Sequence, residues 1–296
     1  MTKIAGSMVA IVTPMSGGIA PDSPIDWVAL DRLLEFHIDN GTDGIVAVGT
    51  TGESATLSEE EHCQAIKHVV DKVAGRIPVV AGTGANSTSE AVRLTQCAKE
   101  AGADACLLVT PYYNKPTQQG LIDHHSFVAE AVDIPQILYN VPGRTACDMS
   151  VATITELAKV PNIVGVKEAT GEVERVSPLR EGCGEEFLLL SGDDLTGRDF
   201  MLAGGDGVIS VTANVAPKLM NELCAAALAG DAEKAAEVDD KLVALHRDLF
   251  VESNPIPVKW AMHKMGYGDP AIRLPLTWLP AAEQAVVAKA MAAAGI

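Results

Sequence analysis

The chain has 296 residues, of which 48% are hydrophobic and 21% charged, a composition typical of a folded globular protein. Its formal net charge of −17 disfavours nucleic acid and anionic membrane surfaces as partners, because both bind through clustered lysine and arginine. No apolar run approaches the roughly 20 residues of a membrane-spanning helix, so small molecules, anionic ones included, remain as the expected ligands.

Short runs of apolar and β-branched residues recur along the chain, and turns and helical patterns separate them. Runs of this length without apolar–polar alternation are typical of strands buried on both faces of a parallel sheet. The predicted strands are residues 7–12, 44–48, 77–81, 105–109, 135–139, 163–167, 187–190 and 207–211.

A strand and a helix that alternate eight times predict a closed (β/α)8 TIM barrel. An open, doubly wound parallel sheet is the alternative. That alternative is less favoured because no run is followed by a GxGxxG turn with an acidic residue downstream.

The helical segments support this division. Amphipathic patterns predict helices over residues 27–39, 58–74, 87–101 and 151–159, and two of these begin with capping-box pairs, Ser58 with Glu61 and Ser87 with Glu90. After about residue 216 we predict no further strand, only helices over residues 217–229, 232–250, 255–265 and 281–294. We therefore expect a barrel over residues 1–224 and a C-terminal helical extension over residues 225–296.

The six cysteines lie far apart in the sequence and include no CxxC pair. A chain of this length does not need disulfides, so we expect reduced thiols that act mainly as small buried side chains. Residues 1–5 reach polar, glycine-containing sequence too soon for a secretory signal, which favours a cytoplasmic protein.

Lys167 ends the predicted strand 163–167, and alternation places it on the same side as Ile163 and Gly165. If that side is the barrel interior, burial disfavours the ammonium form and lowers the pKa of this lysine. A neutral lysine in a dry barrel can form a Schiff base with a ketone. The structural alternative is a lysine whose ammonium reaches the solvated rim.

Other chemistry-bearing residues follow neighbouring strands, at the end where barrel enzymes carry their sites. Tyr139 could relay a proton, the turn that holds Thr50 and Thr51 could bind a carboxylate through its backbone, and Arg144 could bind a second one. The alternatives are an amphipathic packed tyrosine, an ordinary β–α turn and an arginine that caps the surface.

Metal chemistry has little support in the sequence. The seven histidines form no HExxH motif and no paired Cys/His set, and the adjacent His124 and His125 point to different faces of a predicted helix. Asp193 and Asp194 could ligate Mg²⁺, but paired acids at a turn are more often solvated or cap a helix. We therefore expect a metal-free site.

Three motifs together resemble the dihydrodipicolinate synthase family, which belongs with the N-acetylneuraminate lyase group of class I aldolase barrels. They are GTTGES at 49–54, YNVPGRT at 139–145 and GVKEAT at 165–170, and the resemblance extends over essentially the whole chain. It implies a lyase that condenses pyruvate with L-aspartate-4-semialdehyde on the way to diaminopimelate and lysine.

The resemblance also implies roles for individual residues. Lys167 would form the Schiff base with pyruvate without any added cofactor, and Tyr139, Thr50 and a neighbouring subunit's Tyr113 would relay protons. Thr51 would bind the carboxylate of pyruvate, and Arg144 would bind that of the semialdehyde. Gly192 and Ile209 match backbone positions that line the pocket.

Family members are commonly dimers of dimers, so the resemblance implies a homotetramer. Many carry a lysine-feedback site at the tight dimer interface, and the residues that match it here are Ser54, Ala55, His62, Asn86, Glu90 and Tyr112. Glu59 stands where some inhibited bacterial members carry histidine, which makes feedback by lysine a hypothesis.

Two other functions remain as alternatives. One is a different pyruvate-dependent aldolase on the same barrel, acting on sialic acid or a sugar acid. Arg144 argues against this alternative, because a polyol substrate offers no second carboxylate. In addition, sialic-acid lyases generally carry GSTGE where this chain has GTTGE. The other is a barrel that binds a 2-oxo acid as a sensor without turning it over.

Overall fold

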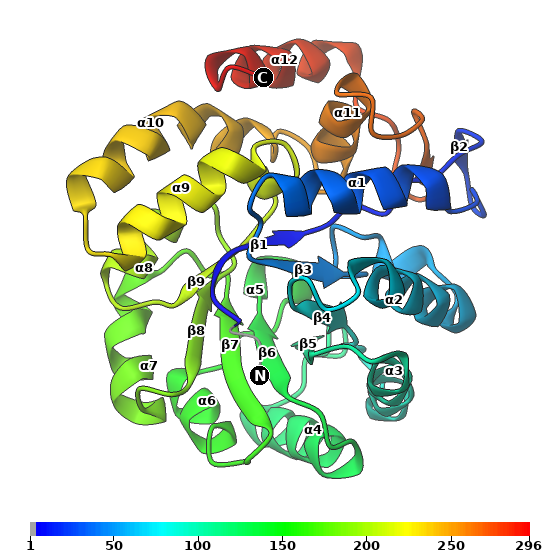
Figure 1. The fold of residues 1–296 in the computed structure, drawn as a ribbon. Helices are drawn as coiled ribbons and strands as arrows, with labels where there is room; N and C mark the ends of the chain where they lie inside the picture. Colours follow the sequence, from blue (N-terminus) through cyan, green and yellow to red (C-terminus); the bar gives the residue numbers. More distant parts are fainter. Residues whose placement is uncertain (1–3) are drawn as a thin grey trace.

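The computed structural model describes residues 4–296, so residues 1–3, part of the segment considered as a leader above, lie outside the described residues. Eight parallel strands form a closed barrel in the order β1-β3-β4-β5-β6-β7-β8-β9, surrounded by helices (Figure 1). The predicted TIM barrel is confirmed. The strands are β1 Gly6–Ala10, β3 Gly44–Ala47, β4 Val79–Gly82, β5 Ala105–Val109, β6 Gln136–Asn140, β7 Ile163–Glu168, β8 Leu188–Ser191 and β9 Gly207–Ser210.

Helices connect the strands and cover the outside of the barrel (Figure 1). Those of the barrel are α1 Trp27–Asp39, α2 Glu59–Val73, α3 Thr88–Ala101, α4 Gln118–Ala131, α5 Pro142–Thr145, α6 Val151–Leu157, α7 Val176–Cys183 and α8 Gly197–Leu202. Short 3-10 turns lie at η1 Ser54–Thr56, η2 Val173–Arg175 and η3 Thr212–Asn214.

The two predicted capping boxes have different outcomes. Ser58 accepts a hydrogen bond from the backbone N–H of Glu61, and the Glu61 carboxylate accepts one from the N–H of Ser58, so this box is confirmed. The second box is wrong. The hydroxyl of Ser87 caps no backbone N–H and instead lies 3.1 Å from the hydroxyl of Ser89.

The C-terminal extension is helical, as predicted, and packs beside α1 (Figure 1). Its helices are α9 Pro217–Leu228, α10 Ala232–Asp248, α11 Ile256–Lys264 and α12 Ala281–Ala293. One further strand lies within it, contrary to expectation: β10 (Ile272–Arg273) pairs in parallel with β2 (Ile19–Ala20). A strand of two residues is too short to form an apolar run in the sequence, so no pattern predicts β10. The predicted domain boundary at 224/225 falls within α9 and stays a prediction.

Cys63 on α2 and Cys97 on α3 form a disulfide, so the expectation of free thiols is wrong for this pair. They are 34 positions apart in the sequence, and the packing of α2 against α3 brings their Cα atoms to 6.0 Å. Cys106, Cys147, Cys183 and Cys224 are free, and all but Cys183 are buried, in line with their expected packing role.

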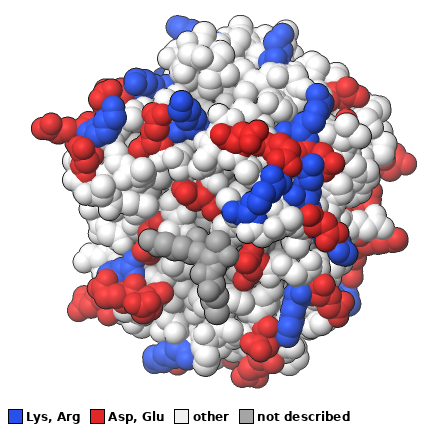
Figure 2. Space-filling model, in the orientation of Figure 1, with Lys and Arg blue, Asp and Glu red and all other residues white. Residues whose placement is uncertain are grey.

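Across residues 4–296, no helix is both long and apolar enough to cross a membrane. On the face drawn in Figure 2, lysine and arginine side chains are interspersed with aspartate and glutamate. That face therefore offers no continuous basic patch of the kind that binds nucleic acid.

Candidate active site

A cavity of about 130 Å³ lies at the carboxyl ends of the barrel strands. Its walls include six of the eight residues predicted for catalysis and substrate binding, which are Thr50, Thr51, Tyr139, Arg144, Lys167 and Gly192. They come from separate βα turns and strands, and the closed barrel brings them together although up to 142 positions separate them in sequence (192 − 50). The position of the cavity agrees with the usual place of active sites in TIM barrels.

Lys167 is the buried amine of this cavity. It lies opposite Tyr139 in the register of β6 and β7, and only 6% of it is exposed. Its Nζ is 4.3 Å from the centre of the Tyr139 ring, and in the described part of the chain no carboxylate lies within 4.0 Å of it. An amine held against an aromatic ring without an anionic partner is available to a carbonyl compound that enters the cavity.

The predicted orientation of strand 163–167 is wrong at one residue. Gly165 and Lys167 pair with Ile137 and Tyr139, whose side chains fill the barrel interior, but Ile163 packs in the outer core with the helices. The register between β6 and β7 shifts after Ile163, so the strict alternation that connects it to Lys167 is broken there.

The turn after β3 places Thr50 and Thr51 on the cavity wall. Val48, just before it, has a φ of 52°, a conformation that costs energy for a β-branched residue. Within residues 4–296, no acceptor bonds the backbone N–H of Thr50 or of Thr51. Two backbone donors without a protein acceptor at a partly buried turn are a feature that suits a carboxylate.

Arg144 lies on α5, at the mouth of the cavity. Its Nη2 donates to the backbone carbonyl of Asn254 at 3.5 Å, and among the described residues no carboxylate lies within 4.0 Å of its guanidinium. The planar donor face of this arginine is therefore free for an anionic ligand.

The two remaining predicted residues lie apart from the cavity wall. Ile209 is buried on β9, paired with Met8, and contributes to the barrel interior. Tyr113 is 89% exposed, with a φ of 74°, so in a single chain it does not reach the cavity.

Sequence reasoning missed two polar residues of the cavity wall, Asn254 and Asp193. Asp193 appeared only as a weak metal ligand, although its place after β8 was a usable signal. Asn254 lies between α10 and α11, and its amide Nδ2 donates to the hydroxyl of Thr51 at 3.0 Å. No sequence pattern in the helical extension predicts that this residue contacts the mouth of the barrel.

Comparison with known proteins settles the family. The model described as "Dihydrodipicolinate synthetase family" matches residues 3–294. The chain belongs to this family. The predicted resemblance is thus confirmed over nearly the whole sequence.

Individual relatives support the same family assignment. The chain is 64% identical over 293 residues to a Methylococcus capsulatus protein named 4-hydroxy-tetrahydrodipicolinate synthase, with 99% of each chain covered. A Stutzerimonas stutzeri protein of the same name is 61% identical with the same coverage.

Solved structures of dihydrodipicolinate synthases superpose closely. The Acinetobacter baumannii enzyme, described as chloride inhibited and complexed with pyruvate, is 55% identical with a TM-score of 0.96 and covers 99% of this chain and 100% of its own. The enzyme of Cyanidioschyzon merolae, described with lysine bound, is 37% identical with a TM-score of 0.93 and 98% coverage of both chains.

In this family member a second cavity, of about 440 Å³, adjoins the first and shares Thr50, Val141, Arg144 and Asn254 with it. Five of the six residues predicted for a feedback site line it, namely Ser54, Ala55, His62, Glu90 and Tyr112. Asn86 does not, although its backbone carbonyl accepts a hydrogen bond from Asn114 nearby. Burial lowers the pKa of His62, whose Nε2 lies 2.7 Å from the carbonyl of Gly82.

A buried ionic cluster connects the turn after β3 to the C-terminal extension. Glu53 follows Thr50–Thr51 in the left-handed conformation, with a φ of 60°. Its carboxylate accepts from Nζ of Lys259 on α11 and from the backbone N–H of Arg273 on β10. The guanidinium of Arg273 in turn binds Glu61 on α2 at 2.6 Å. The helical extension thereby holds the turn that carries the two threonines.

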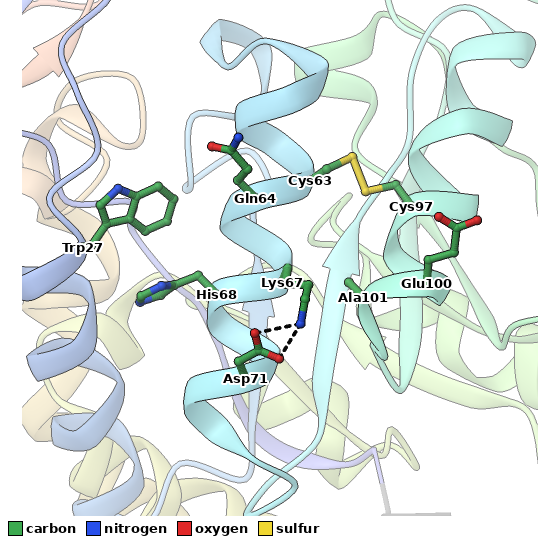
Figure 3. Close-up of a pocket in the computed structure, with 9 residues that line it drawn as sticks. All are labelled: Trp27, Cys63, Gln64, Lys67, His68, Asp71, Cys97, Glu100 and Ala101. Carbon is green, nitrogen blue, oxygen red and sulfur yellow. Dashed lines mark hydrogen bonds and ion pairs between the residues drawn. A yellow bond between two sulfur atoms is a disulfide. The ribbon is translucent and has the colours of Figure 1, made fainter.

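The groove drawn in Figure 3 lies outside the barrel, between α1, α2 and α3, and shares no lining residue with these two cavities. The Cys63–Cys97 disulfide lies in its wall, Trp27 stands 4.8 Å from the ring of His68, and Lys67 pairs with Asp71 (Figure 3). No predicted site residue lines it. In residues 4–296, no group of three or more His, Cys, Asp or Glu side chains is arranged to bind a metal ion.

Proposed function

We propose that this chain is a 4-hydroxy-tetrahydrodipicolinate synthase, a lyase that condenses pyruvate with L-aspartate-4-semialdehyde. The observation that carries the proposal is a buried amine without an anionic partner, Lys167, in one cavity with two separate groups for carboxylates. Names of relatives at 60–64% identity and a pyruvate complex of a relative at 55% support it.

The first step needs the carboxylate of pyruvate on the free N–H groups and hydroxyls of the Thr50–Thr51 turn. Nζ of Lys167 then attacks the keto carbon, and loss of water from the carbinolamine leaves an iminium. Tyr139 lies beside the amine and gives and takes the protons of this step, with Thr50 and Tyr113 of a neighbouring subunit extending the relay. No added cofactor takes part in the proposed chemistry.

The second step uses the iminium as an electron sink. Loss of a proton from the methyl group gives an enamine, whose carbon attacks the aldehyde carbon and forms the new carbon–carbon bond. The amino group of the former semialdehyde then attacks the iminium carbon, closes the ring and releases Lys167. Atoms balance, with one water formed overall.

Arg144 accounts for the proposed substrate specificity. Its free guanidinium at the cavity mouth suits the carboxylate of the semialdehyde, whereas sialic acid and sugar acids would present hydroxyl groups there. An aldolase for those substrates is the alternative that product analysis must exclude.

Product formation from pyruvate and L-aspartate-4-semialdehyde tests the function. We expect turnover by the wild type and a loss of several decades in kcat for Lys167→Ala, with the fold retained by circular dichroism. Lys289→Ala, on the exposed face of α12, is the matched control and should keep full activity. Cleavage of N-acetylneuraminate without condensation would refute the proposal.

A second function, feedback inhibition by lysine, is favoured by the cavity of about 440 Å³ that adjoins the first. Its wall carries the carboxylate of Glu90 and the phenol of Tyr112, groups that suit an amino acid ligand. Glu59, at the position where some inhibited members have histidine, is paired at 2.7 Å with Arg93, which lowers the pKa of its carboxyl. Its charge is thereby partly neutralised.

Initial rates with millimolar L-lysine test this second function. We expect inhibition of the wild type that Glu90→Gln weakens about tenfold or more, since it removes one charged partner of the ligand. Glu100→Gln, on the same helix but facing the outer groove, should respond like the wild type. Rates that do not change with lysine would refute it.

We also propose that the enzyme works in the cytoplasm as a homotetramer, in which Tyr113 enters the neighbouring subunit's site. The exposure of this large aromatic ring, 89%, favours a partner surface that covers it. Sedimentation should give a tetramer, and Tyr113→Phe should lower kcat without changing the assembly. A fully active monomer would contradict both statements.

A further inference from the structure

Asn254 contacts both side chains proposed to bind substrate carboxylates. It is 5% exposed, lies on the segment between α10 and α11, and lines both cavities. Its amide Nδ2 donates to Oγ1 of Thr51 at 3.0 Å, and its backbone carbonyl accepts from Nη2 of Arg144 at 3.5 Å. The Thr51 bond connects positions 203 residues apart and is fully buried.

The direction of the Thr51 bond matters, because a threonine hydroxyl has one hydrogen to donate. A side chain that donates to Oγ1 occupies an acceptor position of that oxygen and leaves the hydroxyl hydrogen free. A carboxylate accepts only, so Thr51 binds it well only when this hydrogen points into the cavity. An amide N–H is therefore the right partner for Thr51, and an acceptor in the same place would be the wrong one.

We propose that Asn254 is a positioning residue of the condensation: its side-chain amide directs the hydroxyl hydrogen of Thr51 toward the first substrate's carboxylate. The inference rests on the proposed function and adds a residue of the C-terminal extension to the machinery. It gives the extension a role in recognition of the first substrate, since two of its residues, Asn254 and Lys259, bond to Thr51 and Glu53 of one turn.

Two substitutions separate this role from simple packing. Asn254→Ala removes the amide that donates to Thr51. We expect the KM for pyruvate to rise about tenfold, because Thr51 then binds the substrate's carboxylate less well, and we expect a smaller change in kcat. Asn254→Asp keeps the shape but reverses the polarity, because its carboxylate takes the Thr51 hydrogen and repels the substrate. Its KM should rise at least tenfold above that of Asn254→Ala.

A double-mutant cycle localises the effect. In a Thr51→Val background, which keeps the shape but has no hydroxyl, Asn254→Ala should change the KM for pyruvate less than twofold. Asn221→Ala, which removes an amide near the opposite end of the barrel where Asn221 contacts Asp43, should leave both KM values unchanged. Thermal melting of every variant accompanies the kinetics.

Failure of the positioning role and failure of the proposed function give different experimental results. If the wild type neither condenses the two substrates nor forms an adduct with pyruvate, the function itself is refuted. If the wild type is active but Asn254→Asp binds pyruvate as well as Asn254→Ala or better, the positioning role is refuted. An undiminished effect of Asn254→Ala in the Thr51→Val background would also overturn it.

Discussion

Gly192 lies directly against the side chain of Lys167. A Cβ atom at this position would lie 2.8 Å from Cε and 3.1 Å from Cγ of the lysine, and 2.6 Å from Cβ of Ala169. These separations are shorter than van der Waals contact. The glycine therefore leaves the room in which the amine of Lys167 faces the cavity.

Gly192→Ala should displace Lys167 and lower kcat by about tenfold to a hundredfold, because small misplacements of a reacting group cost that much. Stopped-flow or steady-state rates check this, with circular dichroism for the fold. Gly120→Ala, on α4 with its nearest neighbours at an ordinary 3.4 Å, is the control and should keep wild-type rates. Equal rates for both variants would show that the contact does not position the amine.

Lys259→Met should destabilise the protein by about 3–5 kcal/mol, since it leaves the buried carboxylate of Glu53 without its cation. Burial lowers the pKa of Lys259, and the neighbouring Glu53 opposes that shift. Urea unfolding gives the free energy. The double variant Lys259→Met/Glu53→Gln should recover part of the loss, because no charge is then left unpaired; if it is less stable than the single variant, the pairing argument is wrong.

Stability should fall as the pH drops below about 6.5, partly because of His37. This side chain is fully buried on α1, and burial lowers its pKa from 6.5 to about 3. The unfolded chain therefore binds a proton between these pH values that the folded chain does not, which favours unfolding. Between pH 7 and pH 5 the loss from this group is about 2 kcal/mol.

His37→Gln should reduce this pH dependence, measured as the difference in unfolding free energy between pH 7 and pH 5. Part of it should remain, because burial also lowers the pKa of His124 to about 4. A variant with the full wild-type difference would show that His37 titrates normally in the folded state.

The Cys63–Cys97 disulfide should stabilise the fold. The bridge closes a loop over a sequence separation of 34 residues, for which the chain-entropy model gives about 3–4 kcal/mol. Thiol titration in denaturant should count four free thiols before reduction and six after it, since the chain has six cysteines and two form the bridge. Cys63→Ser should melt earlier than Cys183→Ser, and six titratable thiols without reductant would contradict the bridge.

Much of the fold was readable because a buried parallel strand is a short apolar run with turn residues beyond it. All eight barrel strands and helices such as Trp27–Asp39 lie where the pattern predicted them. The errors have tertiary causes. The register shift after Ile163, the pairing of Ile272–Arg273 with β2 and the meeting of Cys63 with Cys97 all depend on neighbours that come from other parts of the chain.

The candidate site was readable to a similar degree. Strand ends in a barrel converge, so Thr50, Tyr139 and Lys167 could be grouped from the sequence, and all three line the cavity. Asn254 could not be assigned to the site in this way, because no sequence pattern in a helical extension indicates which of its residues contacts the mouth of the barrel. The role proposed for Tyr113 needs a second chain, since its side chain is 89% exposed and does not line the cavity of its own barrel.

Trapping with sodium borohydride tests the central claim, that Lys167 forms an iminium with pyruvate. The wild type is incubated with pyruvate, reduced, digested and analysed by peptide mass spectrometry. We predict one reduced pyruvate adduct on the peptide that contains Lys167, none in Lys167→Ala, and loss of activity in step with labelling. An unlabelled Lys167 in an enzyme that still turns over pyruvate, or a stable adduct on another lysine, would contradict the account.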